Sequence, residues 1–366
     1  MYDYLVVGAG FAGATMAERL AAALGARVLL IDRREHLAGN AYDPLNEHGV
    51  RIHLYGPHIF HTSSERVVEY LSRFTDWRPY EHAVLARVRG RLVPIPINQV
   101  TLNDLFGVPM SEDAAAAFLA SRAEPVARIA TSEDAIVAKV GRELYELFFR
   151  GYTRKQWGLD PSQLDPTVCG RIPTRVNGDC RYFTDAFQQM PRDGYGALFA
   201  AMVDHPLIDV ALGVSYREIA DRERFGHVVF TGPIDEFYEH RFGPLPYRSL
   251  HFEFETHGVE RYQEAPVINE PDESVPYTRT TEFKYVTGQA HPMTTVVREY
   301  PRAEGDPYYP IPNPECRAVY QRYAELASRE RHVTFVGRLA EYRYYNMDQV
   351  VASALATFDD LAKARV

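Results

Sequence analysis

The sequence predicts an α/β fold in which a Rossmann-type dinucleotide-binding domain is combined with a helical insertion and a multistranded antiparallel sheet domain. Four observations support this prediction. A glycine-rich βαβ unit occupies the first forty residues, and an Ala-rich, charged stretch without strand alternation covers residues 111–150. Strand-like segments follow, and α/β character returns over residues 314–366. A chain of 366 residues is long enough for two or three domains.

The βαβ unit is the clearest local element. Residues 4–7 (YLVV) form a buried strand that runs directly into a GxGxxG turn, and residues 14–24 are rich in Ala and Leu and suit a helix. A second strand over residues 27–31 ends at Asp32, which stands 19 positions after the last glycine of the turn. In this strand–turn–helix context the motif predicts dinucleotide binding, with Asp32 accepting hydrogen bonds from an adenosine ribose.

Each glycine of the turn has a mechanical role. Gly8 permits the tight turn, Gly10 lets the backbone approach a pyrophosphate, and Gly13 lets the helix pack closely on the strand. Phe11 and Ala12 open the helix, whose N-terminal N–H groups favour phosphate. These residues alone do not choose between NAD and FAD.

The segment that follows Asp32 favours FAD. Residues 33–40 (RREHLAGN) resemble the extension that wraps the cofactor in FAD proteins of the glutathione-reductase type. Residues 51–62 then bring His53, His58 and His61 around a Gly-Pro turn. A metal site would need a further ligand, but no carboxylate or cysteine stands at ligand spacing. We predict histidines that line the cofactor and no metal; a purely structural loop is the alternative.

The middle and end of the chain complete the predicted architecture. Residues 131–134 have the form of a capping box, and apolar residues follow at helical spacing, which predicts a helix inside the insertion. The strand-like segments, consistent with an antiparallel sheet, are His227–Thr231, Leu250–Thr256, Thr278–Tyr285 and Thr294–Tyr300. The C-terminal part is expected to contain a helix near 315–329, a strand over Val333–Gly337 and a final helix near 347–362.

Seven segments result from this division of the chain. They are 1–75 for the FAD-binding Rossmann part, 76–110 for a segment of the sheet domain, 111–165 for the helical insertion, 166–195 for a mobile lid and return segment, 196–230 for a return to the FAD-binding domain, 231–313 for the antiparallel-sheet substrate domain, and 314–366 for the C-terminal completion of the FAD-binding domain.

Composition excludes several classes of protein. With 40 Lys and Arg against 49 Asp and Glu, the net charge is −9, and no basic block favours nucleic acid or an anionic membrane. No apolar run approaches the length of a membrane span, and the N-terminus lacks a signal peptide, so a cytoplasmic protein is expected. The three cysteines form no CxxC pair, which argues against a disulfide framework or a Cys-rich zinc site.

Arginines interleaved with tyrosines recur along the chain. The segments are GYTRKQWG (151–158), GRIPTR (170–175), RYF (181–183), PYTR (276–279), PYYP (307–310) and GRLAEYRY (337–344). A single pair is more simply a surface cation–π contact, but several clusters beside an FAD motif predict a site for a nucleotide diphosphate. No Ser-His-Asp arrangement, GxSxG or DxD motif stands out, so no protein nucleophile is evident.

These motifs together resemble those of the bacterial UDP-galactopyranose mutases. The resemblance covers nearly the whole chain, through GAGFAGA, YGPHIFHT, ELYELFFRGYTRKQWG, RIPTR, VPYTR, PYYPI and FVGRLAEYRYYNMD. It implies an FAD enzyme of galactofuranose biosynthesis that interconverts UDP-galactopyranose and UDP-galactofuranose without net redox change. In that reaction N5 of the reduced flavin is the nucleophile at the anomeric carbon, which explains why the protein offers none.

The resemblance also implies roles for individual residues. Arg171 and Arg279 correspond to the arginines that hold the pyrophosphate and the charge of the reduced flavin, and His61 is the third catalytic candidate. The substrate is expected to contact these two arginines together with His82, Phe148, Tyr152, Thr153, Trp157, Tyr182, Tyr309 and Tyr344. The cofactor is expected to contact Gly8, Gly10, Phe11, Ala12, Gly13, Asp32, Asn40, His58, Ile59, Arg338, Tyr345, Asn346, Met347, Asp348 and Gln349.

Three positions depart from the pattern of the family. Ala38 stands where a glycine is expected, which is harmless if its φ is negative. His82 replaces an Asn near the uracil, and Asn346 replaces an Asp, which removes a negative charge close to the flavin or sugar.

Two alternative functions remain open. One is an amine-oxidase-like FAD oxidoreductase, which would oxidise its substrate with O₂ or another acceptor. The other is a nucleotide-sugar-binding protein whose flavin is structural.

The resemblance further implies a homodimer that binds UDP-galactose and UDP. Residues 163–175 are expected to form a lid that delivers Arg171 when UDP arrives.

Overall fold

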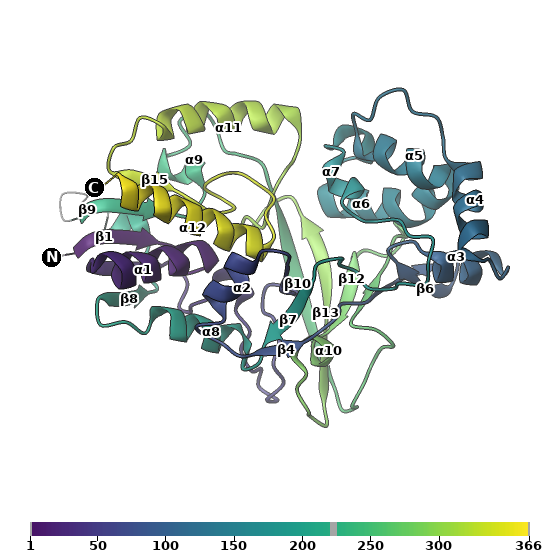
Figure 1. Ribbon diagram of the computed structural model, residues 1–366, viewed down its shortest axis with the longest axis horizontal. Helices are drawn as coiled ribbons and strands as arrows, with labels where there is room; N and C mark the ends of the chain where they lie inside the picture. Colours follow the sequence, from purple (N-terminus) through teal and green to yellow (C-terminus); the bar gives the residue numbers. More distant parts are fainter. Residues whose placement is uncertain (1, 220–224, 365–366) are drawn as a thin grey trace.

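The computed structural model describes residues 2–219 and 225–364, and Figure 1 shows three parts in it. A layer with a parallel sheet lies at one end, a largely antiparallel sheet lies in the middle, and a lobe of helices lies at the other end. Three separate segments of the chain contribute to the part with the parallel sheet, and both termini lie there. Residues 1, 220–224 and 365–366 of the predicted segments lie outside the described residues.

The parallel sheet has the order β15-β9-β1-β2-β8 within the described residues. Its strands are β1 (Tyr2–Val7), β2 (Val28–Asp32), β8 (Ile208–Leu212), β9 (Phe225–Phe230) and β15 (Val333–Phe335). The helices packed on its main core face are α1 (Phe11–Leu24), α8 (Gly194–Val203) and α12 (Met347–Lys363). This is the predicted Rossmann-type arrangement, completed by segments from distant parts of the sequence.

The grouping of His227–Thr231 with the antiparallel strands is wrong. Strand β9 pairs in parallel with both β1 and β15. Val228, Val229 and Phe230 are all buried, as expected of a central parallel strand covered on both faces. An apolar run of this kind does not specify its partner strands.

The middle sheet has the order β14-β10-β13-β12-β11-β5-β6 in the described chain, with a parallel pair only between β11 and β5. Its strands are β5 (Val84–Val88), β6 (Arg91–Ile95), β10 (Tyr247–His257), β11 (Val267–Asn269), β12 (Arg279–Glu282), β13 (Thr294–Arg302) and β14 (Tyr309–Pro310). A small antiparallel sheet contains β3 (His61–Thr62), β4 (Trp77–Pro79) and β7 (Phe187–Pro191).

The strand expected over Thr278–Tyr285 is too long. It ends at Glu282, and residues Phe283–Thr287 form the short helix α10 instead. Phe283 and Val286, three positions apart, are both fully buried, which is helical spacing. Gly288 ends the helix with φ +68°, a left-handed conformation that glycine adopts without a steric penalty.

The helical lobe contains α3 (Gln99–Phe106), α4 (Glu112–Arg122), α5 (Ser132–Tyr145), a π-helical turn over Glu146–Arg150, α6 (Gly151–Trp157) and α7 (Thr167–Gly170). The capping box is confirmed: the Asp134 amide donates to Oγ1 of Thr131 at 3.2 Å, and the Thr131 amide donates to the Asp134 carboxylate at 2.9 Å. Helix α3 starts before the stretch expected to be helical. Further helices are α2 (Glu65–Leu71), α9 (Ile234–Phe237) and α11 (Pro314–Ala327).

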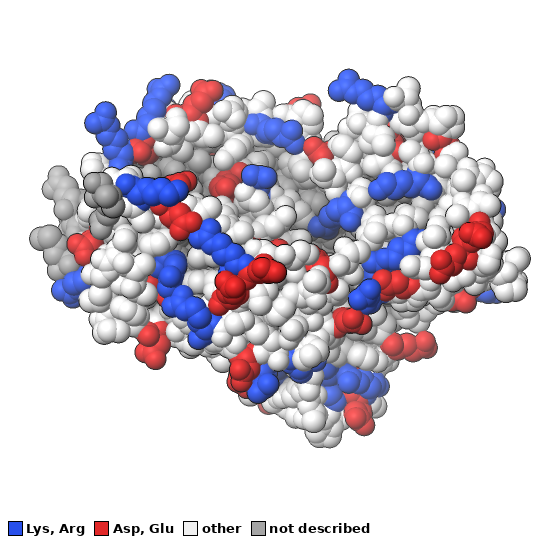
Figure 2. Space-filling model, in the orientation of Figure 1, with Lys and Arg blue, Asp and Glu red and all other residues white. Residues whose placement is uncertain are grey.

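Charges of both signs are mixed on the surface. In Figure 2, Lys and Arg alternate with Asp and Glu across the visible face, without a large area of one sign. The same view shows a hollow between the part that carries α11 and the lobe that carries α5–α7. Among the helices of residues 2–219 and 225–364, none is long and apolar enough to cross a membrane.

Candidate active site

A first cavity lies over the glycine-rich turn at the carboxyl end of β1. Among the residues predicted to bind the cofactor, those that line it are Gly8, Gly10, Phe11, Ala12, Asp32, Asn40, His58, Arg338 and Met347. Its far wall contains Ser215, Tyr216 and Phe237, which follow β8 and β9. The position, outside the carboxyl ends of parallel strands, is the usual ligand site of such sheets.

The three glycines of the turn differ in what surrounds them. A Cβ at Gly13 would lie 1.7 Å from the carbonyl oxygen of Gly8, so the backbones of α1 and the turn are in direct contact there. Gly8 itself has φ +102°, in the left-handed range. At Gly10 the nearest atom to a Cβ would be Cα of Gly39 at 3.8 Å, an ordinary contact. Gly13 therefore packs helix against strand, and Gly10 borders open space.

Asp32 holds the turn as well as facing the cavity. Its carboxylate accepts hydrogen bonds from the amides of Ala9 at 2.7 Å and Arg34 at 2.9 Å. A carboxylate has about four lone-pair sites, so two amides leave it able to accept further hydroxyls.

Ala38 does not have the negative φ under which its replacement of glycine would be harmless. Its φ is +74°, and its amide donates to the carbonyl of Ala9 at 3.0 Å. A left-handed conformation costs a non-glycine residue about 1–2 kcal/mol. The backbone bond to the glycine-rich turn holds it in place, so the substitution has a conformational cost.

The remaining predicted cofactor residues lie elsewhere. Ile59 and Asn346 line a second cavity. Tyr345, Asp348 and Gln349 line neither cavity; their side chains bond to Glu341, Thr62 and the amide of Asn346 respectively. Asn346 is the N-cap of α12, so this run places a helix N-terminus beside the two cavities.

The second cavity gathers every residue predicted to contact the substrate. Its lining includes His61, His82, Phe148, Tyr152, Thr153, Trp157, Arg171, Tyr182, Arg279, Tyr309 and Tyr344. It shares His58, Arg338 and Met347 with the first cavity, so the two are contiguous. These residues come from the helical lobe, the segment between α7 and β7, the small and middle sheets, and the loop before α12.

Helical periodicity explains one wall. In α6, Tyr152, Thr153, Gln156 and Trp157 share a face, because residues three and four apart lie near one another on a helix. The preceding π-helical turn, of a kind frequent at functional sites, adds Phe148 and Phe149 to the same wall. Gly158, with φ +67°, ends the helix just after Trp157.

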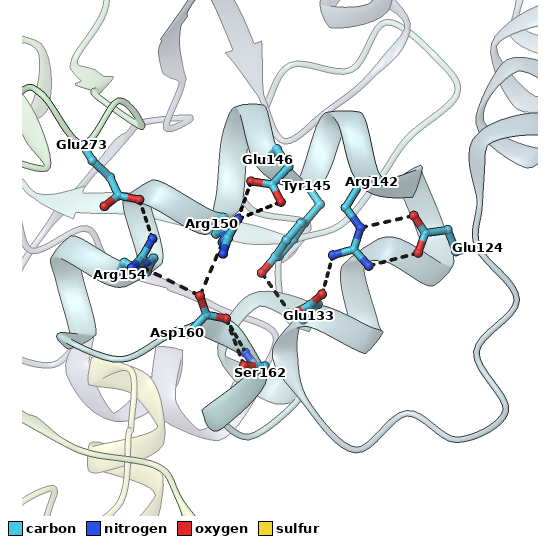
Figure 3. Close-up of polar contacts among 10 residues, drawn as sticks. All are labelled: Glu124, Glu133, Arg142, Tyr145, Glu146, Arg150, Arg154, Asp160, Ser162 and Glu273. Carbon is cyan, nitrogen blue, oxygen red and sulfur yellow. Dashed lines mark hydrogen bonds and ion pairs between the residues drawn. The ribbon is translucent and has the colours of Figure 1, made fainter.

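The ion pairs of this lobe that Figure 3 draws lie outside the second cavity, since none of their residues lines it. Figure 3 shows Arg142 bonded to Glu124 and Glu133, and Arg150 bonded to Glu146 and Asp160. Charged residues therefore lie outward while aromatic residues face the cavity.

Guanidinium groups and phenol rings meet inside the second cavity. The Arg171 guanidinium carbon lies 4.6 Å from the ring centroid of Tyr344, and that of Arg338 lies 5.8 Å from the rings of both Tyr309 and Tyr344. Trp157 contacts the same two tyrosines, with ring centroids 6.1 and 5.9 Å away. Burial acts to raise the pKa of Tyr344, but the nearby arginines, Arg171 first, outweigh burial and lower that pKa.

Arg279 is held by a buried carboxylate. Its Nε donates to Oε1 of Glu299 at 2.7 Å, and Glu299 is fully buried. The Nη groups remain for another anion. Of the side chains lining the second cavity in the described chain, Asp185 is the one carboxylate, against Arg171, Arg279 and Arg338. An acidic protein thus concentrates positive charge at one place, which suits a diphosphate.

The three histidines of residues 51–62 each make a hydrogen bond within the protein. Nδ1 of His58 donates to the carbonyl of Gly56 at 2.8 Å, and the His58 amide donates to Nδ1 of His53 at 3.0 Å. Nδ1 of His61 lies 2.7 Å from the Asp185 carboxylate, and its ring stacks on Phe183. In the described part of the chain, no three His, Cys, Asp or Glu side chains gather as a metal site would require.

Burial also fixes the charge of two histidines in the second cavity. It lowers the pKa of His58 to about 4 and that of His82 to about 3, so both are neutral at pH 7. The Tyr80 hydroxyl lies 2.9 Å from Nδ1 of His82. His82 thus presents a neutral polar group where the family pattern led us to expect an amide.

Sequence reasoning missed several lining residues. Phe183, Asp185 and Asn269 line the second cavity. Phe183 follows Tyr182 in a motif already singled out, so adjacency could have suggested it. Asp185 and Asn269 carry no local signal, because only the pairing of distant strands brings them to the cavity.

Comparisons with known proteins assign the chain to a family. Residues 147–344 match the family model of UDP-galactopyranose mutase, and residues 6–74 match that of the NAD(P)-binding Rossmann-like domain. A probable UDP-galactopyranose mutase from Klebsiella pneumoniae is 41% identical over 364 residues, covering 98% of this chain and 94% of the relative. A dTDP-fucopyranose mutase from Escherichia coli is 38% identical and covers 97% of each chain.

Solved structures share the fold. A reduced UDP-galactopyranose mutase has a TM-score of 0.80 at 15% identity, over 100% of this chain and 94% of that one. A putrescine oxidase variant has a TM-score of 0.58 at 13% identity, over 99% of both chains. At such low identity these structures inform on fold alone.

With a family model matching more than half of its length and full-length relatives above 30% identity, this chain belongs to the UDP-galactopyranose mutase family.

Proposed function

We propose that this protein is an FAD-dependent isomerase that interconverts UDP-galactopyranose and UDP-galactofuranose without net oxidation of the sugar. One observation carries the proposal: the Arg- and Tyr-lined cavity meets the dinucleotide cavity at His58, Arg338 and Met347. A flavin ring at that junction would face the sugar of a nucleotide diphosphate. When bound and reduced, FAD supplies the nucleophile for the anomeric carbon through its N5 atom.

The residues of the first cavity fit FAD. The free space at Gly10, the start of α1 at Phe11 and the carboxylate of Asp32 form a set suited to pyrophosphate and ribose. Arg338 and the N-terminus of α12 lie on the side toward the second cavity, where they can meet a negatively charged reduced flavin.

In the second cavity, the protein binds and orients the substrate. Arg171 and Arg279 hold the pyrophosphate as UDP departs and returns, and Tyr309 and Tyr344 donate hydroxyl hydrogens to its oxygens. The wall formed by Phe148, Tyr152, Thr153, Trp157 and Tyr182 holds the uridine, with His82 at its base. These contacts fix the sugar over the reacting atom and exclude water.

His61 is oriented for proton handling. The Asp185 carboxylate can only accept a hydrogen bond, so Nδ1 of His61 donates to it, and Nε2 is the ring nitrogen left to exchange a proton with the substrate. We assign it the task of receiving and returning a sugar-side proton during ring opening and closure.

Product analysis tests the proposal. Protein reduced with dithionite is incubated with UDP-galactofuranose, and UDP-galactopyranose is expected without consumption of further reductant. Net oxidation of the sugar-nucleotide with O₂ uptake would indicate an oxidoreductase instead. UDP binding without turnover would indicate a binding protein. Because a dTDP-fucopyranose mutase is similar at 38% identity, dTDP-fucopyranose is tested in parallel; turnover of that sugar alone would contradict the substrate proposed here.

Asp32→Ala is expected to weaken FAD binding. The substitution leaves ribose hydroxyls without their acceptor, which costs about 1–3 kcal/mol, or about 5- to 150-fold in Kd. FAD affinity is measured by titrating the apoprotein and following flavin fluorescence. Because the carboxylate also holds the amides of Ala9 and Arg34, unfolding midpoints of the apoproteins are compared, and Asp32→Asn, which keeps one acceptor oxygen, serves as the control. Unchanged affinity in Asp32→Ala would show that Asp32 is not the ribose ligand.

Residues 163–175 are expected to become protected when UDP binds. In the described structure Ser132 bonds to the carbonyls of Leu164 and Asp165, and Arg171 lies against Tyr344 in the cavity. UDP would hold this arrangement by its contact to Arg171. Limited trypsin digestion with and without UDP, with cleavage after Arg171 and Arg175 followed by mass spectrometry, measures the protection. Equal cleavage rates would argue against a lid.

We further propose that the protein acts as a cytoplasmic homodimer, as its resemblance to the bacterial family implies. Light scattering of the FAD-loaded protein is expected to give twice the mass of the 41.7 kDa chain.

A further inference from the structure

One conspicuous residue of the GYTRKQWG motif has no part in the function proposed above. Lys155 lies on α6, and its side chain reaches away from the cavity wall toward the loop over residues 270–278, called here the β11–β12 loop. Its Nζ lies within hydrogen-bond distance of four backbone carbonyls of that loop. These are Glu270 at 2.5 Å, Asp272 at 2.8 Å, Val275 at 2.9 Å and Tyr277 at 2.9 Å.

Four carbonyls around one ammonium make an anchor. A lysine has three N–H donors, so the loop saturates its hydrogen-bonding capacity, and each bond is strengthened by the charge. The carbonyl oxygens of the β11–β12 loop point toward the Lys155 ammonium and surround it. Its conformation therefore depends on a cation supplied by another element.

A second observation places the same loop tightly against α6. A Cβ at Gly151, one turn before Lys155, would lie 2.3 Å from the carbonyl oxygen of Pro271. Glycine at this position lets the loop touch the helix backbone. Arg154 also bonds to Glu273 of this loop at 3.1 Å (Figure 3), but both side chains are nearly half exposed, so this ion pair contributes little to holding the loop.

The β11–β12 loop ends at the active site on both sides. Asn269 and Arg279 face each other in the register of β11 and β12, and both line the second cavity. Between the loop and Arg279, the amide of Glu270 donates to the carbonyl of Thr278 at 2.8 Å, and the Thr278 amide donates to the carbonyl of Glu299 at 2.9 Å. Arg279 is the first residue of β12 and directly follows the loop. Because α6 holds the loop, it also determines the position of the Arg279 backbone.

We propose that Lys155 is a positioning residue: by gathering four carbonyls of the β11–β12 loop, it sets the guanidinium of Arg279 for the nucleotide diphosphate. This rests on the proposed function, in which Arg279 binds pyrophosphate. It also couples the two sides of the cavity, since α6 carries the aromatic wall on one face and anchors the arginine strand from the other.

The test compares Lys155→Met with Arg154→Met. Both variants remove one positive charge from neighbouring positions of α6, but the Arg154 side chain is itself 45% exposed, so its ion pairs with Asp160 and Glu273 contribute little. In the FAD-loaded protein, Lys155→Met is expected to weaken UDP binding and lower kcat/KM by about 10- to 100-fold, because small displacements of a binding group have effects of this size. Arg154→Met is expected to stay within about twofold of wild type.

A double-mutant cycle distinguishes positioning from general destabilisation. If Lys155 acts through Arg279, then adding Lys155→Met to Arg279→Ala causes no further loss of UDP affinity. Gly151→Ala, which keeps the lysine but displaces Pro271, is expected to reproduce the loss, and it provides the test if Lys155→Met does not fold.

Three results would overturn the proposal or its basis. Wild-type UDP affinity in both Lys155→Met and Gly151→Ala would overturn the positioning role. Losses that multiply with that of Arg279→Ala would do the same, since Lys155 would then act elsewhere. Wild-type protein that binds no UDP would contradict the proposed function itself, and the role of Lys155 with it.

Discussion

Arg171→Ala and Arg279→Ala are each expected to lower kcat/KM by about 10³-fold, or about 4 kcal/mol of transition-state stabilisation. In the proposed reaction, negative charge builds on UDP as it departs, and these two arginines line the cavity where that charge would lie. Both variants are expected to purify yellow, because neither residue lines the dinucleotide cavity. Steady-state kinetics with UDP-galactofuranose and the flavin content of the purified protein measure the two effects separately.

Arg175 is the matched control for Arg171. It lies four residues further along the same segment but does not line the cavity, and its Nη1 donates to the carbonyl of Asp179 at 3.2 Å. Its truncation is expected to cost stability more than turnover. Arg171→Lys should restore little activity, since an ammonium cannot form the paired hydrogen bonds of a guanidinium. Loss of turnover in Arg175→Ala, with Arg171→Ala near wild type, would mean that the two arginines have exchanged roles.

Gly13→Ala is expected to destabilise the fold by about 4 kcal/mol or more, whereas Gly10→Ala should leave the fold intact and abolish FAD retention. The new Cβ at Gly13 would lie 1.7 Å from a carbonyl oxygen of the turn, and neither backbone can move without separating α1 from β1. At Gly10 the nearest neighbour is 3.8 Å away, so a methyl group fits the protein but occupies the space a pyrophosphate needs.

Urea unfolding of the apoproteins and flavin absorbance of the purified variants distinguish these outcomes. Gly258→Ala, at a position with no atom within 4 Å of the new Cβ, controls for the change from glycine to alanine itself. An apo-form of Gly13→Ala as stable as wild type, or a fully loaded Gly10→Ala, would contradict the division of labour within the turn.

Much of the dinucleotide site was accessible from the sequence because its elements are local. The strand, the turn and the helix follow one another within about twenty-five residues, and each is set by side-chain period and backbone sterics. The capping box at Thr131 was predicted for the same reason, since it involves only four consecutive residues. Asp32 could be identified because the second strand is also part of this unit.

Errors arose where a local pattern permits two outcomes. The segment after Glu282 continues the strand pattern but forms α10, because burying Phe283 and Val286 together favours the helix. Strand β9 looks like other apolar strands, and only its neighbours β1 and β15 make it parallel. The sign of φ at Ala38 depends on a hydrogen bond to Ala9, almost thirty residues earlier.

The sequence by itself determined the glycine-rich turn, the helical character of the lobe and, through its motifs, the family and the residues expected at the substrate. Only the tertiary structure decided that Phe148, Arg171, Arg279 and Tyr344 line one cavity, that this cavity joins the dinucleotide site, and that Lys155 and Asp185 support residues far from them in sequence. The physical reason is the distance along the sequence over which each interaction acts. Turns, caps and periodicity involve a few neighbouring residues, whereas the convergence of distant side chains follows from burying apolar surface shared by the whole chain.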